Sequence, residues 1–175
     1  FLKKIDFAYI SIENLKSYKT TLPPTWDEYN RTVKKSIRSD SRRQYLRLEK
    51  IGNIKFKLAE STEDRHEVIQ EMIKQKRKRY QETGIWDMLA VDEYKQFYKA
   101  LAHMPSNIIS EVHCTSLNVG NISVATHVGI VDRDTFYYLM PTYEGDGWER
   151  FSPGKLLLEF LLKWSLENNL KVFDL

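Results

Sequence analysis

Residues 151–164, FSPGKLLLEFLLKW, are the stretch of this sequence that decides the fold. Pro153 suits the first position of a helix, where the missing backbone N–H leaves no bond unmade. The stretch is apolar on almost every side, so we predict that the helix lies between a sheet and another layer. We expect it to cover residues 153–168 and to end at Asn168 and Asn169, since asparagine tolerates the left-handed conformation.

The start of this helix also predicts a binding site for an anion. Gly154 has no side chain, which lets a ligand approach the backbone closely. The free N–H groups of the first turn, the positive end of the helix dipole and the ammonium group of Lys155 all favour negative charge there. The same sequence also suits the start of a buried helix that binds nothing, and both interpretations stand at this point.

Strand patterns lie on both sides of the helix. Residues 107–118, 122–131 and 135–143 are rich in β-branched and aromatic residues and are joined by short turns, which predicts an antiparallel meander. Residues 171–175 form a final strand that must pair with the meander. A further strand is expected at residues 5–12.

The segment between residues 25 and 104 reads mostly as helices. Thr25 and Glu28 form a capping box, which predicts a helix over residues 26–37. Residues 39–41 predict a second start, with a helix over residues 42–51 that Gly52 ends in the left-handed conformation. Further elements are expected as a half-exposed strand at 53–59, a helix from Ser61 to a stop at Gly84, and a short helix at 92–104.

This order of elements predicts an α+β fold in which helices flank a mixed, mostly antiparallel sheet. A chain of 175 residues fits a single domain. Because it begins at Phe1 and ends at Leu175 inside apparent strands, we expect it to be a fragment of a longer protein.

The composition indicates a globular domain of a reducing compartment. Hydrophobic residues make up 42% and charged residues 29%, as in ordinary globular proteins. The net charge of +3 permits an anionic ligand without demanding nucleic acid, and no DNA partner is expected. Cys114 is the single cysteine and no long apolar run occurs, so we expect a cytoplasmic protein without disulfides.

Several segments together resemble a known family. Residues 137–143 (YYLMPTY), 151–159 (FSPGKLLLE) and 171–175 (KVFDL), with the basic helical segment at 41–50, are similar to the GNAT-fold domain of the CelD/BcsL family associated with cellulose biosynthesis. The broader group includes FemAB-like transferases. The resemblance covers most of the chain, and its most specific parts are the Ser-Pro-Gly helix start and the Phe-Asp-Leu strand.

The resemblance implies acetyl-CoA as co-substrate. It places the pyrophosphate on Ser152, Gly154 and Lys155 and the pantetheine arm along a strand that contains Tyr137, Leu139 and Met140. The sequence departs from the usual GNAT phosphate signature, Gln/Arg-x-x-Gly-x-Gly/Ala, because Glu149 stands at its start and Ser152 at its first glycine.

Three residues are candidates for the chemistry of acyl transfer. His127, in the middle of a meander strand expected to line the cleft, suits a general base. Asp174, at the end of the last strand, would orient an amine or act as base. Tyr138 would act as the acid for the leaving thiolate. Each also has a purely structural interpretation, as a hydrogen-bonded core residue, an exposed strand end or a packed aromatic ring.

Candidates for acceptor binding lie elsewhere. Arg43 and Arg47 share one helix face, Trp86 and Tyr143 would contact a sugar ring or amine, and Tyr143 is a second candidate acid. The basic run at residues 74–79 reads as a solvated helix face. No metal site is expected, because His113 and Cys114 point to opposite faces of their strand and no ligand spacing occurs.

These observations lead to three hypotheses. The first is an N-acyltransferase that moves an acetyl group to an amine, for instance on an amino sugar or a polysaccharide precursor. The second is a FemAB-like transferase that uses aminoacyl-tRNA. The third is a GNAT-fold interaction module without catalysis.

Overall fold

The computed structural model describes residues 18–105 and 109–175, and within these residues a mixed sheet forms the centre. Its strands follow the spatial order β1-β6-β5-β4-β3-β2, and only β5 and β6 run parallel. The strands are β1 (Lys19–Thr21), β2 (Ile54–Leu58), β3 (Ser110–Val119), β4 (Ile122–Asp132), β5 (Thr135–Tyr143) and β6 (Val172–Asp174). The predicted α+β architecture and the antiparallel meander are confirmed.

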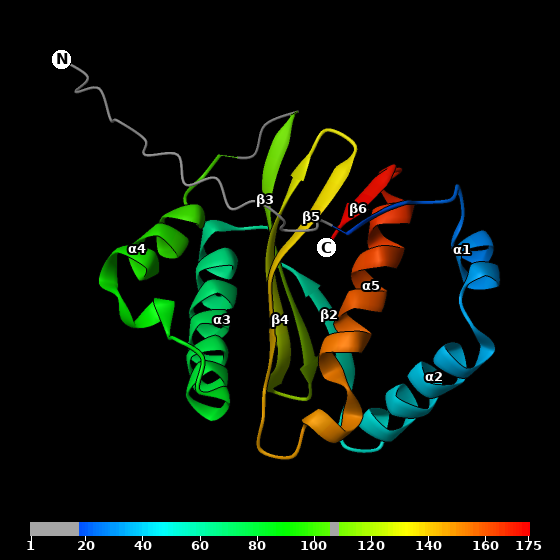
Figure 1. Ribbon diagram of the computed structural model, residues 1–175, viewed down its shortest axis with the longest axis horizontal. Helices are drawn as coiled ribbons and strands as arrows, with labels where there is room; N and C mark the ends of the chain where they lie inside the picture. Colours follow the sequence, from blue (N-terminus) through cyan, green and yellow to red (C-terminus); the bar gives the residue numbers. More distant parts are fainter. Residues whose placement is uncertain (1–17, 106–108) are drawn as a thin grey trace.

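Helices cover both faces of the sheet, as Figure 1 shows. On one side α3 packs on the sheet and α4 packs on α3; on the other side α5 packs on the sheet, with α1 and α2 outside it. The helices are α1 (Trp26–Thr32), α2 (Lys35–Glu49), α3 (Thr62–Thr83), α4 (Asp92–Leu101) and α5 (Pro153–Glu167), with short 3₁₀ turns η1 (Met88–Ala90) and η2 (Glu149–Phe151).

Each face of the sheet has its own apolar core. Leu157 and Leu161 of α5 pack with Phe136 and Phe173 on one face, and Met72 of α3 packs on the other. His113 lies on the α5 side and Cys114 on the α3 side, so their predicted opposite orientation is confirmed. Among the described residues no helix is both long and apolar enough to cross a membrane.

The helix boundaries follow the predicted capping residues closely. Thr25 and Ser61 accept hydrogen bonds from the backbone N–H three residues on, and Gly84 ends α3 in the left-handed conformation. Asn169 also has a positive φ, of 60°, directly after α5. These predictions are confirmed.

Two predictions about the helical segment are wrong. The break between α1 and α2 falls at Val33 and Lys34 rather than at residues 39–41, because Ser41 is buried and Asp40 binds Lys155 of α5. Gly52 is not left-handed; it allows a close approach instead, since a Cβ there would lie 3.1 Å from the backbone nitrogen of Gly120. The strand expected at residues 5–12 lies outside the described residues.

Candidate functional site

The parallel strands β5 and β6 pair over only three residues and then part. Thr135, Phe136 and Tyr137 lie opposite Val172, Phe173 and Asp174, in that order. Residues 138–143 of β5 have no strand partner on that side within the described part of the chain. Their backbone edge is therefore open toward the beginning of α5, which is where a ligand could lie along the strand.

A bulge in β5 lies at the point of divergence. Val128 of β4 faces Met140, whereas Ile130 faces Tyr137, so two steps along β4 correspond to three along β5. Gly129 stands opposite the extra residue, and any side chain there would clash with the carbonyl oxygen of Tyr137 and with the imidazole of His127. A bulge leaves backbone groups unpaired and re-aims the following side chains, a device common beside active sites.

A groove of about 580 Å³ occupies this opening. It is walled by α3, by the free edge of β5 and by the start of α5, so it reaches both faces of the sheet. Five residues predicted from the sequence line it together, namely Tyr138, Tyr143, Ser152, Gly154 and Lys155.

The amino end of α5 faces this groove without a side-chain cap. Ser152, the N-cap residue, is in the left-handed conformation with φ 51° and makes no capping hydrogen bond. No described residue accepts a hydrogen bond from the backbone N–H of Gly154 or Lys155. Free N–H groups at the positive end of a helix bind anions. The strained backbone at Ser152 fits a functional turn, since such strain concentrates at ligand sites.

The ammonium group of Lys155 is held at the edge of the turn by α2. Its Nζ lies 2.9 Å from Oδ2 of Asp40, and the hydrogen bond from Lys155 lowers the pKa of that carboxyl group. Asp40 also binds Arg43. Lys155 therefore adds positive potential beside the groove, while the direct donors in the turn are backbone N–H groups.

The structure corrects the predicted location of His127. The side chain is fully buried beneath α5 and does not line the groove. Neither ring nitrogen has a hydrogen-bond partner among the described residues, and burial lowers the pKa of His127 well below its usual value. The imidazole stacks on Tyr138 instead, with ring centroids 4.7 Å apart and planes 9° apart.

Tyr138 connects this buried layer with the groove. Its side chain lines the groove, and burial raises the pKa of its hydroxyl to about 12. At neutral pH the hydroxyl is therefore protonated and can donate a hydrogen bond or a proton.

The other predicted strand residues lie near the point where β5 and β6 part. Asp174 faces Tyr137 across the last pair before the divergence, one residue from Tyr138. Leu139 lies in the bulge and is 53% exposed, whereas the side chain of Met140 is buried in the core on the α3 side. Met140 therefore offers a ligand on this edge its backbone only.

Three residues predicted to bind the acceptor do not line the groove. Arg43 pairs with Asp40, and Arg47 lies over the ring of Phe151 and donates to the carbonyl of Arg150. Trp86 is 68% exposed and packs edge-on against Tyr94. The structure thus separates these side chains from Tyr143, the one acceptor candidate in the groove.

Two cations of α3 line the groove and were missed in the sequence. Lys76 is half-buried and donates to the carbonyl of Pro141 at 3.0 Å, and burial lowers its pKa. Arg79 lies over the ring of Tyr143 at 5.2 Å. Their position could have been predicted from their spacing relative to the apolar Met72. Residues 72, 76 and 79 fall on one helix face, and that face points toward the sheet.

Lys76 differs from every other cation of its run. Ion pairs hold the rest: Lys74 with Glu71, Arg77 with Asp87, Lys78 with Glu144 and Asp146, and Arg79 with Glu82. Lys76 makes no ion pair within the residues that the structure describes. No group of three or more possible metal ligands occurs in that part of the chain either.

Two comparisons with known proteins give matches. The sequence model of the family described as "Acetyltransferase (GNAT) domain" matches residues 35–175. Among solved structures, the chain is similar to the one described as "Crystal structure of FemX", with a TM-score of 0.64 and 9% sequence identity. The match covers 91% of this chain and 52% of the other, so the chain spans about half of the length of that protein. No curated protein gives a significant sequence match.

Proposed function

Because this chain belongs to the family of GNAT acetyltransferase domains, we propose that it transfers an acyl group, in the first instance acetyl, from acyl-CoA to an amine. One observation carries the proposal: the uncapped amino end of α5 and the open edge of β5 line the same groove. The uncapped helix end suits a pyrophosphate, and the open strand edge suits an extended chain with amide groups. CoA contains both groups, one after the other along the molecule.

The donor lies along β5 and α5 in this proposal. The backbone N–H groups of Gly154 and Lys155 bind the pyrophosphate, and Lys155 strengthens the positive potential. The pantetheine arm begins beside Tyr137, the last residue of β5 that pairs with β6, and adds to the free edge of β5 over residues 138–140, as a peptide adds to a sheet edge. Leu139 contributes an exposed side chain, and Tyr137 and Met140 contribute backbone groups. The thioester then lies near the bulge, where backbone N–H groups of β5 stabilise the developing oxyanion in this proposal.

The chemical step needs few groups. The amine nitrogen attacks the thioester carbon, the C–N bond forms, and the C–S bond breaks with its electron pair on sulfur. We assign Tyr138 as the acid that protonates the departing thiolate. Asp174, at the divergence of the strands, orients the amine and takes its proton. His127 positions Tyr138 through the stack rather than touching substrate.

The acceptor enters from the α3 side of the groove. Lys76 and Arg79 line that side, and Lys76 is a half-buried ammonium group without an acidic partner among the described residues. An acceptor amine that also carries a carboxylate or phosphate would complement it. Tyr143 contacts this acceptor, and an amino sugar or polysaccharide precursor in the cytoplasm fits the requirement. Arg43, Arg47 and Trp86 would meet only the distant parts of a large acceptor.

A second candidate function is an aminoacyl-tRNA-dependent transfer. The sequence resemblance to FemAB-like transferases and the likeness of fold to FemX favour it. It predicts binding of tRNA that weakens steeply with salt, because each neutralised phosphate releases counterions. Binding of acyl-CoA depends far less on salt.

Isothermal titration with acetyl-CoA and CoA tests the leading proposal. We expect saturable binding of both at moderate ionic strength, and release of free CoA thiol when amines are added. If neither molecule binds while tRNA binds at low salt, the donor assigned here is wrong and the second function replaces it.

A further inference from the structure

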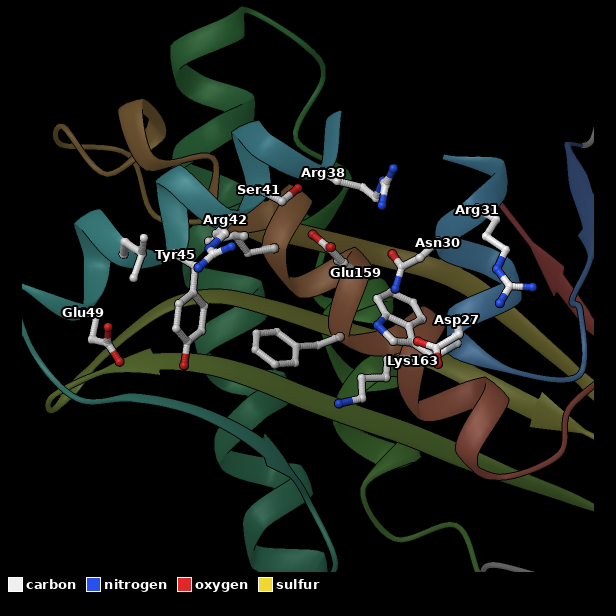
Figure 2. Close-up of a pocket in the computed structure, with 14 residues that line it drawn as sticks. Asp27, Asn30, Arg31, Arg38, Ser41, Arg42, Tyr45, Glu49, Glu159 and Lys163 are labelled. Atoms are coloured by element: carbon white, nitrogen blue, oxygen red, sulfur yellow. The ribbon is translucent and has the colours of Figure 1, made fainter. Parts of the chain in front are cut away.

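A second hollow of the described structure lies on the outer side of α5. It has a volume of about 880 Å³ and lies between α1, α2 and the outer side of α5, as Figure 2 shows. The volume is within the range of small-molecule sites. Nothing in the proposed acyl transfer uses this outer groove.

Aromatic rings form the apolar part of the outer groove. Trp26, Tyr45 and Phe160 line it, one from each helix. Two of these rings stack on a neighbouring ring. The ring centroids of Phe160 and Phe56 are 5.4 Å apart, and those of Trp26 and Tyr29 are 5.1 Å apart. Braced rings make a preformed surface on which a planar ring can stack.

Arginine side chains without ion-pair partners surround these rings. Arg31, Arg38 and Arg42 line the outer groove, and none of them forms an ion pair within residues 18–105 and 109–175. The neighbouring Arg43 shows the contrast, because Asp40 neutralises it. In Figure 2 the guanidinium groups of Arg38 and Arg42 lie higher in the view than the ring of Tyr45, on the side of α2. Guanidinium groups bind phosphate in a bidentate manner.

The outer groove also carries hydrogen-bond acceptors. In Figure 2 Glu159 of α5 lies between Arg42 and Asn30. Burial raises the pKa of Tyr29 on α1, and the nearby carboxylate of Glu159 raises it further. A carboxylate beside an amide suits sugar hydroxyls, which donate to the first and exchange hydrogen bonds with the second.

We propose that the outer groove binds a nucleoside phosphate. The base stacks on the aromatic rings, the ribose hydroxyls meet Glu159 and Asn30, and the phosphates meet Arg38 and Arg42. A simple anion would use the arginines and leave the rings uncovered, whereas an apolar ligand would leave the arginines uncompensated. A phosphorylated nucleoside uses all three kinds of group.

Two sources supply this chemistry, a free nucleotide and the nucleotide end of CoA. A small hollow of about 110 Å³ shares Lys155 and Leu158 with the groove at β5, and Arg38 and Ser41 with the outer groove. The two sites therefore adjoin along α5. The proposal concerns the outer groove itself and holds for either source.

Titration with ADP as the probe tests the inference. We expect saturable binding, weakened about ten-fold or more when Arg38→Met and Arg42→Met are combined, since both charged contacts to phosphate are lost. Lys35→Met, an exposed cation of the same helix outside the groove, is the matched control and should leave the affinity unchanged. Adenosine and pyrophosphate should each bind at least about ten-fold more weakly than ADP. Equal binding of pyrophosphate and ADP, no saturable ADP binding, or an affinity that the double variant retains would overturn the inference.

The same variants distinguish the two sources and keep this test separate from the donor proposal. If the nucleotide end of CoA occupies the groove, CoA binds more tightly than dephospho-CoA and the double variant removes the difference. If a free nucleotide occupies it, the double variant loses ADP and keeps CoA; both results support the groove as a nucleotide site. Binding of ADP with no binding of CoA would reject the proposed donor and leave this inference standing.

Discussion

His127 lies directly beneath Tyr138, with the two rings 4.7 Å apart and within 9° of parallel. The relationship joins a residue that never reaches solvent to one that lines the groove at β5. His127, expected from the sequence to act as a base, therefore supports the ring of Tyr138, which we propose as the acid.

The first prediction tests whether His127 only supports the ring of Tyr138 or takes part in proton transfer. His127→Ala leaves a space behind Tyr138 and should lower kcat about ten-fold or more, since small displacements at a reacting centre have large effects. His127→Phe keeps a flat ring there and should retain most of the activity. The measurement is the rate of CoA release, with the unfolding temperature of both variants as control. Equal loss in both variants at equal stability would show that a ring nitrogen takes part.

The second prediction concerns the approach of the donor to Gly154. A Cβ at this position would come 3.3 Å from Cδ1 of Tyr143 and would project into the groove. Gly154→Ala should weaken the binding of CoA, and Gly154→Val should abolish it in titration. Because alanine favours a helix over glycine by up to about 1 kcal/mol, Gly154→Ala should not lower the stability appreciably. Undiminished CoA binding by Gly154→Val would remove the turn from the donor site.

The third prediction assigns Lys76 to the acceptor. Lys76→Met should raise the KM for an acceptor that carries an anionic group by about ten-fold to a hundred-fold, as expected for a lost charged hydrogen bond. The kcat and the KM for acetyl-CoA should stay the same, and Lys76→Arg should restore much of the loss. Lys74→Met, on the exposed face of α3, is the control. A fall in kcat with an unchanged acceptor KM would contradict this role.

The fourth prediction is a dependence of stability on pH. Burial lowers the pKa of His113 to about 3, against 6.5 for an exposed histidine. Between these values the unfolded chain binds a proton that the folded chain does not, so stability falls as pH drops below about 6.5. This single group should cost on the order of 3 kcal/mol between pH 7 and pH 4. Urea unfolding at both pH values measures it.

Two variants check the assignment to His113. His113→Phe should reduce the loss of stability between pH 7 and pH 4 by about the contribution of this one group, because a ring remains and its titration disappears, while His127, whose pKa burial also lowers, keeps its own contribution. His103→Gln, at an exposed position after α4, should leave it unchanged. An equally steep fall in stability in His113→Phe would place its origin in other groups.

The sequence predicted most elements because their signals are local. The capping side chains of Thr25 and Ser61, the left-handed Gly84 and the two meander turns depend on near neighbours in the chain. The features that were predicted wrongly depend on contacts with residues distant in the sequence. Residues 39–41 look like a helix start, yet α5 binds Asp40 and covers Ser41, and helix α2 runs through them.

The site was predicted in part for the same reason. The turn from Ser152 to Lys155 follows from local chemistry. Tyr138 was a candidate as the acid for the leaving thiolate, and Tyr143 as a second acid or an acceptor contact. The tertiary fold brings both into the same groove as the turn. The bulge opposite Gly129 breaks the alternation of side chains along β5, so alternation alone could not place Met140 correctly. Alternation along β4 likewise gives the face of His127 but not the helix that covers it. The outer groove needs three helices that only the tertiary fold brings together.

The central claim is that the uncapped turn of α5 and the free edge of β5 bind the acyl donor. The most direct measurement is a titration of the ¹⁵N-labelled chain with CoA, following the amide resonances of Gly154, Lys155 and Leu139. We predict that these three resonances shift together and saturate with one affinity, and that Gly154→Val abolishes the shifts. Saturable binding that leaves all three unmoved would contradict the claim.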